Sequence, residues 1–499
     1  MIFSKYYVIF TLTFCNFFKE SKHYILLFQQ CVIILKYQKT NFLRVFKMTN
    51  MTEGKPLKLI FPFMVPLLIG NIFQQLYNIS DIIIVGQMLG MNALAAVGAT
   101  SPIFVLTIFV TFGLSSGFSV VTGQRFGAND MKGVRRSFAC SITLSVIIII
   151  LMVIFFNLII DPLLNVMNVP ANIYQDGKDY ILIIINGLAA MMAYNLFSAI
   201  LRALGDSKTP LYALIISTVI NIGLAILFVG PLHWGIPGSA YALVIAQAIS
   251  AFFCIIWIYH YLPELHISHQ DFICNWSEIW EHLRMGLPMA GHFSVLGIGI
   301  LVMQSVANSF GPETIAGFTA AMRVEQICTQ PMVSAGLAMA VFTAQNYGAR
   351  KIHRIREGVK TMSLCSLAYA VTATIIIVLF GEQIVNLFLD NPQSEVMASA
   401  RAYFHYSIPF YFFLGQIFIY RNTLQGMGLS MLPLCGAVLE LIARCGSAIF
   451  LAPLVGFMGV CLAEPISWFS SSSLFAGFYF YFIKILERSY QPKQPFTDN

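Results

Sequence analysis

Long apolar runs separated by short polar stretches fill the chain from residue 59 to residue 483. A helix needs about 20 apolar residues to cross a bilayer, and continuous runs of this length indicate helices rather than the alternating strands of a β-barrel. The pattern predicts an all-α polytopic membrane protein with twelve transmembrane helices. The predicted spans are 59–85, 93–122, 137–160, 179–201, 210–230, 236–262, 281–308, 314–342, 360–389, 402–424, 431–453 and 459–483.

The two halves of this pattern repeat each other with a shift of about 221 residues. GQRFGAND at 123–130 returns as AQNYGARK at 344–351, and LRALGDSKTP at 201–210 returns as LQGMGLSMLP at 424–433. An even number of spans per half gives two copies of the same orientation, as in carriers built from parallel repeats. The repeat predicts two six-helix bundles related by a pseudo-two-fold axis along the membrane normal, with a cavity between them.

Composition and charge agree with a membrane protein. Hydrophobic residues make up 58% of the chain and charged residues 10%, against about 25% charged in soluble globular domains. The net charge of +7 lies mainly in the short loops after spans 2, 4 and 8, which is typical of cytoplasmic loops and not of a nucleic-acid surface. We expect both termini in the cytoplasm and the protein in the inner (plasma) membrane.

The chain divides into five predicted parts: an extension outside the fold (1–47), an amino-terminal bundle (48–262), a cytoplasmic linker (263–280), a carboxyl-terminal bundle (281–486) and a cytoplasmic tail (487–499). The extension holds two short apolar runs with lysines between them, too short to predict a span. We expect translation to begin at Met48; the alternative is an additional membrane-associated segment.

The first span carries one carboxylate, Asp81, together with Gln74, Tyr77 and Asn78. These positions are spaced i, i+3, i+4 and i+7, so the four polar groups share one helix face. A carboxylate in a span costs about 2.5 kcal/mol or more, so Asp81 is predicted to face a cavity and to exchange H⁺ or Na⁺. The alternative is a structural aspartate between helices. Pro66 removes a backbone donor and is predicted to act as a hinge.

Other polar residues within spans are candidates for the same or a second site. Asn195 and Asn221 are predicted to bond Asp81 or help to hold a cation, or else to link helices. The predicted substrate-cavity residues are Gln74 in the first span and, in the second half, Glu325, His292, Gln326 and Gln416. Glu440 and Arg444 are i, i+4 neighbours and predict an internal ion pair.

Several enzyme signatures are absent or misplaced in this sequence. Gly113-Leu114-Ser115-Ser116-Gly117 fits GxSxG, but it lies inside a span rather than at a strand–turn–helix elbow. The sequence contains no HExxH and no Walker P-loop, and its ten cysteines include no CxxC pair. We expect no enzyme, no cofactor and no metal centre apart from a possible Na⁺ near Asp81.

Taken together, these residues resemble the multidrug and toxic compound extrusion (MATE) family. The resemblance rests on PFMVPLLIGNIFQQLYNISDIIIVG, ALAAVGATSPI, the repeated QxxGA, ILRALGDSKTP and EPISW, and covers about residues 48–486. It implies a V-shaped pair of bundles that exports organic cations in exchange for H⁺ or Na⁺, with Asp81 as the family's first-span acid and Pro66 as its bending proline.

The sequence departs from the family at several positions. Ala225 stands where many bacterial relatives carry a second acid four residues after Asn221, and the threonine often seen in span 6 is missing from GSAYALV at 238–244. Leu296 and Gly415 stand near the places of acids in some Na⁺-coupled relatives. These departures favour H⁺ coupling through Asp81.

The expected function is a secondary antiporter, acting as a monomer, that exports small amphipathic drugs of cationic and aromatic character and has no nucleic-acid partner. Abundant methionine and phenylalanine (22 and 43 residues) suit an adaptable binding surface for such molecules. The alternative is a lipid-linked oligosaccharide flippase of the same broad superfamily. Such a flippase needs a strongly cationic cavity for diphosphate, and the predicted spans hold few Lys or Arg.

Overall fold

All regular elements in the described part of the chain are helices, as the apolar runs predict. The computed structural model describes residues 48–307, 310–386 and 394–490. The N bundle comprises α3 (Pro56–Leu89), α4 (Met91–Gly127), α5 (Met131–Val166), α6 (Ala171–Asn186), α7 (Leu188–Ala203), α8 (Lys208–Val229) and α9 (Gly235–Tyr261). The C bundle comprises α10 (Trp276–Ala307), α11 (Pro312–Gly348), α12 (Ile352–Asn386), α13 (Ser394–Ser407), α14 (Tyr411–Gly426), α15 (Met431–Gly446), α16 (Ala452–Val455) and α17 (Phe457–Tyr490).

Short turns link these helices. Two 3₁₀ turns, η2 (Pro263–Leu265) and η3 (His269–Phe272), lie between the bundles, and η5 (Ile408–Phe410) separates α13 from α14. The π-helical η6 (Ser447–Leu451) joins α15 to α16. Since α10 begins at Trp276, the predicted linker 263–280 includes the first turn of this helix.

Nine of the described helices are long and apolar enough to cross a membrane, and the pair α6–α7 makes a tenth candidate. The sequence predicts span 4 as one helix over 179–201, whereas the structure has two helices from Ala171 to Ala203, bent by 46° around Gly187. The segment α15–η6–α16 is one of the nine, and the turn η5 divides α13 from α14. By length and apolarity the described residues give nine to ten candidate crossings, and their helices confirm the predicted all-α fold class.

The internal repeat is visible in the backbone. Residues with positive φ, which end helices or join them, occur at matching positions in the two halves. The φ angles within each matched pair are nearly equal, and the number of residues between the two members is almost constant. The matched positions are Gly90 and Gly311 (φ 85° and 92°), Asn129 and Arg350 (59° and 56°), Gly205 and Gly428 (89° and 86°), and Gly235 and Gly456 (62° and 66°). Glycine adopts this conformation without steric penalty, which explains why three of the four pairs are glycine.

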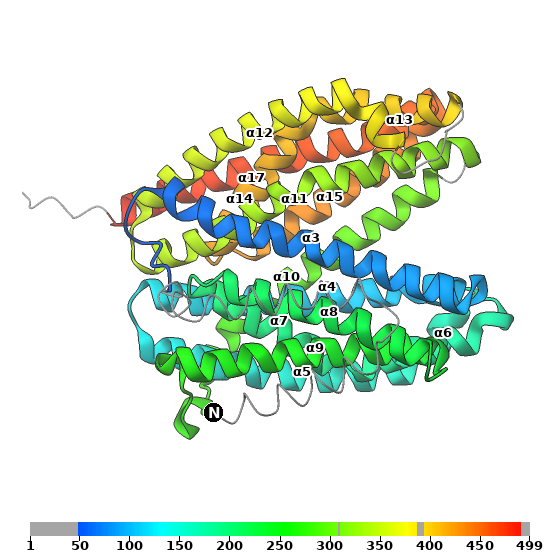
Figure 1. Ribbon diagram of the computed structural model, residues 1–499. Coiled ribbons are helices and arrows are strands. Elements are labelled where there is room, and N and C mark those ends of the chain that lie inside the picture. Colours follow the sequence, from blue (N-terminus) through cyan, green and yellow to red (C-terminus); the bar gives the residue numbers. More distant parts are fainter. Residues whose placement is uncertain (1–47, 308–309, 387–393, 491–499) are drawn as a thin grey trace, which may run out of the picture. The chain divides into compact units, whose positions relative to one another are not determined.

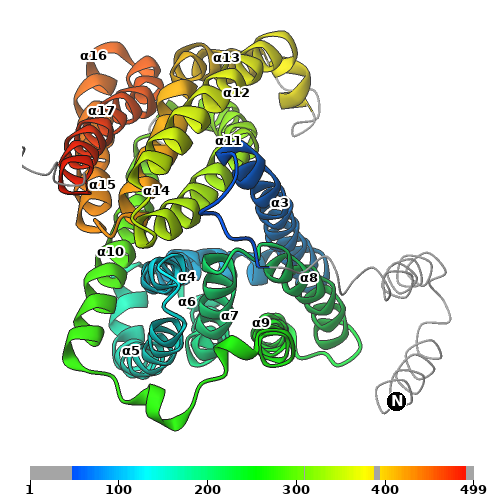
Figure 2. The ribbon, with the colours of Figure 1, turned by 90° about the vertical axis from the view of Figure 1, so that its left-hand side faces the viewer.

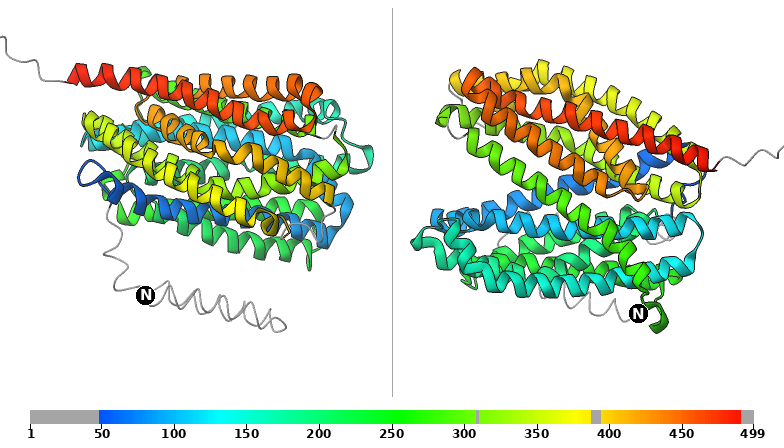
Figure 3. Two further views of the ribbon diagram at one scale, coloured as in Figure 1. Left: turned by 90° about the horizontal axis from the view of Figure 1, so that it is seen from above. Right: turned by 180° about the vertical axis from the view of Figure 1, so that it is seen from behind.

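The two bundles lie side by side, and α3 runs along the boundary between them (Figures 1 and 2). Ile60 and Phe63 of α3 pack into the core of the C bundle, whereas Ile84 and Val85 pack with helices of the N bundle. Pro66 lies on α3 between these two sets of contacts. Seen from behind, α10 runs obliquely from one bundle to the other (Figure 3).

The peptide before α3, residues Thr49–Thr52, is held against the loop that joins α11 to α12. Met51 is fully buried, its backbone N–H donates to Gln345 Oε1 (2.8 Å), and its carbonyl accepts from Asn346 Nδ2 (3.0 Å). Residues from Thr49 onward belong to one structural unit. The predictions for residues 1–47 and for most of the tail lie outside the described residues.

Candidate functional site

Asp81 lies on α3 and is 8% exposed. Its carboxylate accepts a hydrogen bond from Ser239 Oγ (2.8 Å), which is fully buried in the first turns of α9. Sequence reasoning did not predict Ser239, because 158 residues separate it from Asp81. The signal was present in GSAYALV, where the sequence lacks the expected threonine but offers a hydroxyl one residue after Gly238.

Two tyrosines lie near the Asp81 carboxylate. Tyr77 of α3 and Tyr180 of α6 are 4% and 2% exposed, and both interact electrostatically with Asp81. The Tyr77 hydroxyl is buried and has no hydrogen-bond partner among the described residues, as is also true of Gln247 Oε1. The pocket therefore offers the carboxylate one hydroxyl donor and further unused oxygen atoms.

The predicted asparagines are placed differently. Asn195 of α7 donates to Thr111 Oγ1 of α4 (3.4 Å), so it links two helices. Asn221 of α8 is fully buried, and both atoms of its amide lack a partner within the described residues. The Asn78 side chain lies outside the described residues. The structure therefore joins Asp81 to Ser239 rather than to either asparagine.

The predicted cavity residues fall into two groups by exposure. Gln74 and Glu325 are half-buried and Gln326 is exposed, whereas His292 and Gln416 are 0% and 3% exposed. Gln416 Oε1 accepts from Ser363 Oγ (2.9 Å), which links α14 to α12. Gln416 and His292 are thus engaged in helix packing within the C bundle.

The two hydrogen-bond partners of His292 determine its protonation state. Its Nδ1 lies 2.9 Å from the Pro433 carbonyl, which only accepts, and its Nε2 lies 3.2 Å from Arg421 Nη1, which only donates. The ring is therefore neutral, with the proton on Nδ1. The Arg421 guanidinium also lies over the Phe418 ring, 4.8 Å from its centroid.

The structure contains the Glu440–Arg444 contact and adds a third member to it. Arg444 donates to Glu440 Oε1 (2.8 Å) and to Glu464 Oε2 of α17 (2.9 Å). All three side chains are at least 90% buried. Glu464 lies in the EPISW segment, 20 residues from Arg444, so helical spacing alone could not reveal this contact.

The repeated QxxGA motifs hold the two bundles together at one end. Gln124 Nε2 of the N bundle donates to the Gly426 carbonyl of the C bundle, and Gln345 Nε2 of the C bundle donates to the Ala203 carbonyl of the N bundle, both at 2.9 Å. Under the repeat, Gln124 corresponds to Gln345 and Ala203 to Gly426. We call these two reciprocal hydrogen bonds the inter-bundle lock.

Glycines allow the bundles to approach this closely. A Cβ added at Gly127 would meet the Gln345 backbone, and one added at Gly348 would meet the Gln124 backbone, both within 2 Å. Ion pairs between the bundles, Arg125–Glu281 (2.7 Å) and Arg136–Glu278 (2.9 Å), lie at the start of α10. The two bundles are therefore closed together at this end.

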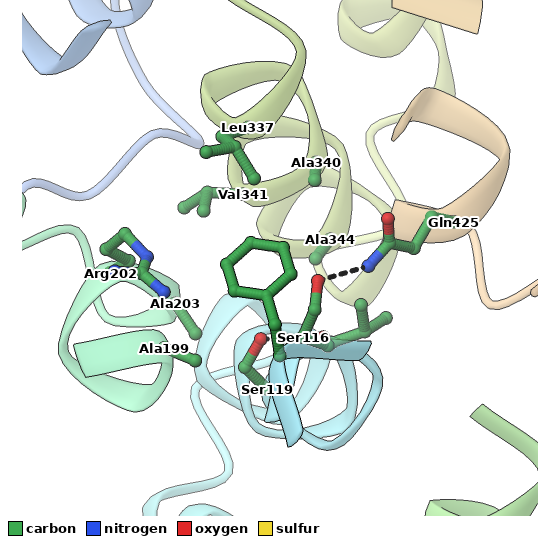
Figure 4. Close-up of a pocket in the computed structure, with 12 residues that line it drawn as sticks. Ser116, Ser119, Ala199, Arg202, Ala203, Leu337, Ala340, Val341, Ala344 and Gln425 are labelled. Carbon is green, nitrogen blue, oxygen red and sulfur yellow. Dashed lines mark hydrogen bonds between the residues drawn. The ribbon is translucent and has the colours of Figure 1, made fainter. Parts of the chain in front are cut away.

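A small pocket of about 30 Å³, with room for about two water molecules, lies beside the lock and is partly open to solvent. Its lining comes from both bundles, with Ser116 and Arg202 on one side and Gln425 on the other (Figure 4). Gln425 Nε2 donates to Ser116 Oγ (2.8 Å) across the boundary. Most of the remaining lining is alanine, valine and leucine, so the pocket is mainly apolar.

The GxSxG segment serves packing. Ser115 is 1% exposed and donates to the Thr111 carbonyl one turn earlier (2.8 Å), so it has no access to a substrate. A Cβ at Gly113 would lie 2.6 Å from Ala290 of α10, and one at Gly117 would lie 2.5 Å from Gly286. Small residues in this segment allow α4 and α10 to pack closely.

Known proteins match this chain over most of its length. The MatE family model matches residues 66–227 and 288–445, one match in each half. The "Probable multidrug resistance protein YpnP" of Bacillus subtilis is 29% identical over 387 residues, which cover 77% of this chain and 85% of that protein. The "Probable multidrug resistance protein YoeA" of the same species is 27% identical over 432 residues, covering 84% and 92%.

Solved structures agree in fold. A structure described as the outward-facing conformation of a multidrug resistance MATE family transporter superposes with a TM-score of 0.82 at 24% identity, covering 89% of this chain and 99% of that one. A crystal structure of MATE in the bent conformation gives the same TM-score and coverage. Because the family model matches more than half of its residues, the chain belongs to the MATE family, whose members are membrane transporters and not enzymes.

Proposed function

We propose that the protein is a secondary antiporter that exports amphipathic drugs of cationic and aromatic character in exchange for an ion bound at Asp81, and that this ion is H⁺. The comparisons support multidrug efflux as the broader activity, since the curated relatives above carry that name. The observation that carries the finer proposal is the buried Asp81 carboxylate with a single hydroxyl donor, Ser239.

A lone carboxylate in this setting favours a proton over Na⁺. A proton needs one carboxyl oxygen, and Ser239 already donates to the Asp81 carboxylate. Ala225 supplies no second acid, so Na⁺ would in addition have to draw in neutral oxygen atoms such as those of Tyr77 and Asn221. Binding of a proton removes a charge whose presence in a span is costly.

We propose that α3 transmits this change to the bundle contact. Its contacts with the C bundle run from Ile60 past Pro66 to Asn71, which donates to Ser334, and its later residues Ile84 and Val85 pack in the N bundle. Because Pro66 lacks an N–H, α3 bends there at small energetic cost. An ion at Asp81 then shifts the equilibrium between two carrier states. The size of this shift is set by the difference between its affinities for the two states.

We propose that the closed end of the bundles faces the cytoplasm. The loops at this end carry the basic residues Arg125, Lys351 and Arg354, which is typical of the cytoplasmic side. Both termini then lie in the cytoplasm, and we propose that the carrier acts as a monomer. The pocket beside the lock has Arg202 as its only basic lining residue, which does not favour a lipid-diphosphate substrate.

The test is ethidium transport into proteoliposomes with imposed H⁺ or Na⁺ gradients applied separately. We expect a proton gradient to drive ethidium against its concentration gradient, and Asp81→Asn to abolish this while ethidium binding persists. Asp176→Asn, at an exposed position on α6, is the matched control and should transport normally. Transport by Asp81→Asn equal to wild type, or dependence on Na⁺ alone, would refute the proposal.

A further inference from the structure

Arg202, near the end of α7, is a basic side chain without an acidic partner in the described part of the chain. It is half-buried and forms no hydrogen bond or ion pair with a described residue; the groups that interact with it electrostatically are Tyr194 and Cys254, which are uncharged at neutral pH. Asp206, the next acid along the chain, uses its carboxylate to accept hydrogen bonds from the first residues of α8. A guanidinium inside a membrane protein usually pairs with an acid or with carbonyl groups, so the charge of Arg202 lacks a counter-ion.

The pocket that Arg202 lines lies where the two copies of the internal repeat meet (Figure 4). The repeat segments that begin at Leu201 and Leu424 match Arg202 with Gln425, and both residues line the pocket. Lining residues of α4 are matched by lining residues of α11 at the shift of 221 residues. These pairs are Ser116 and Leu337, Ser119 and Ala340, and Val120 and Val341. The two walls therefore belong to different bundles, and the pocket has this form only while the bundles are closed together.

Two further hydrogen-bond donors lie in this pocket. Ser116 Oγ accepts from Gln425 Nε2 (2.8 Å), and no described residue accepts the O–H of Ser116 in turn. The Gln425 amide has a second N–H that no described residue accepts either. Figure 4 shows Ser116 and Gln425 pointing toward each other, with Arg202 across the pocket. None of the described residues that line the pocket is acidic, so its polar groups suit an anion and not a cation.

The size of the pocket limits what it can hold. About 30 Å³ leaves room for about two water molecules, which is enough for a chloride ion and too little for a drug or a lipid headgroup. We propose that the pocket binds one small inorganic anion, of the size of chloride, between Arg202 and the Ser116–Gln425 pair, and that this anion holds the two bundles closed. The inference goes beyond the proposed antiport and does not depend on which ion binds at Asp81.

The effect on the carrier follows from the position of the site. An anion that contacts both bundles binds the closed state better than an open state in which Arg202 and Gln425 have separated. At a chloride concentration ten times its dissociation constant, the closed state is favoured about 11-fold over an open state that binds no chloride.

Chloride NMR of the purified protein tests the site directly, because chloride that exchanges between a protein site and the solvent broadens the solvent line. In sodium gluconate buffer of constant ionic strength, the wild type should cause a saturable broadening that nitrate displaces. Arg202→Gln, which introduces the residue that the repeat has at Gln425, should abolish this broadening. Arg488→Gln, at an exposed position on α17, is the matched control and should keep it.

Hydrogen–deuterium exchange tests the effect of the anion on closure. In the wild type, exchange in the last turns of α4 and α7 should be about tenfold slower in sodium chloride than in sodium gluconate, and in Arg202→Gln it should be equal in the two salts. Wild-type broadening in Arg202→Gln would overturn the anion site. Exchange in the wild type that does not respond to chloride would overturn its role in closure.

A second variant decides the matter if Arg202→Gln does not fold. Ser116→Ala removes the free O–H and leaves the guanidinium in place, so it should weaken chloride binding about tenfold, as expected for one hydrogen bond to a charged group. Chloride affinity equal to wild type in Ser116→Ala would then refute the proposed site.

Discussion

Replacing Gln345 by methionine should open the contact between the two bundles. Gln345 is fully buried and uses both ends of its amide: Oε1 accepts from the Met51 N–H (2.8 Å), and Nε2 donates to the Ala203 carbonyl (2.9 Å). Methionine has nearly the same volume but forms neither bond. The closed state then buries one N–H and one carbonyl without partners.

The magnitude follows from the two lost hydrogen bonds. Each is worth about 1 kcal/mol net, and more when the remaining partner stays buried and unsatisfied, so the closed state should lose at least about 2 kcal/mol. Met51 packs in the core of the C bundle, as does the helix of Gln345, so its bond is lost in the closed and in the open state alike. The bond to Ala203 crosses to the N bundle and is lost only from the closed state. The equilibrium between closed and open should therefore shift by about fivefold, since about 1.4 kcal/mol corresponds to a tenfold change.

Hydrogen–deuterium exchange measured by mass spectrometry is the assay. In Gln345→Met we expect faster exchange in the last turns of α4 and α7, which face Gln345 from the other bundle. Gln124→Met, which removes the single matching bond to Gly426, should show a smaller effect in α14. Gln87→Met, at an exposed position on α3, is the control. If α4 and α7 exchange in Gln345→Met at the same rate as in the wild type, the role assigned to the inter-bundle lock is refuted.

Three further predictions concern single positions. Ser239→Ala removes the one hydrogen-bond donor to Asp81 that the described residues provide and should slow proton-driven ethidium transport while binding persists; an unchanged pH profile of transport would contradict this. Gly117→Val should lower the thermal unfolding temperature, because a Cβ there would lie 2.5 Å from the α10 backbone and overpacking costs about 1–3 kcal/mol; Gly98→Val, on the same helix with no atom within 4 Å, should be neutral. Hydrogen bonds from the backbone N–H and the hydroxyl of Ser268, the residue before η3, hold the pKa of Asp271 below its usual value, so their stabilisation is present at neutral pH and is lost as the pH falls through the lowered pKa. The protection factors of the amides in residues 263–275, after correction for slower intrinsic exchange in acid, should fall with pH in the wild type and not in Asp271→Asn.

Periodicity and length predicted the membrane helices because burial in lipid requires continuous apolar runs, a property of neighbours in sequence. The same reasoning missed the bend at Gly187. The sequence is apolar on both sides of the bend. Position 187 requires glycine because the Val244 side chain of α9 occupies the place that a Cβ would take. Such a contact between distant helices leaves no mark on the local pattern.

In the candidate site, too, the sequence predicted some features and missed others. The spacing on α3 was enough to select Asp81, because one carboxylate in a span stands out from its surroundings. Its partner Ser239 could not be predicted, since serine is common in helices and its contact depends on how α3 and α9 pack. The QxxGA repeat was visible in the sequence, but the reciprocal bonds of Gln124 and Gln345 to the opposite bundle required the structure.

The buried peptide at Met51 has a practical consequence for expression of this protein. A reading frame started at Met51 would replace the peptide N–H that meets Gln345 with a charged ammonium group, in a place where the residue is fully buried. Desolvation of that charge is costly, and the Thr49 backbone contact to Gly205 would be lost as well. An amino-terminally shortened variant should therefore keep Thr49 as well as Met51.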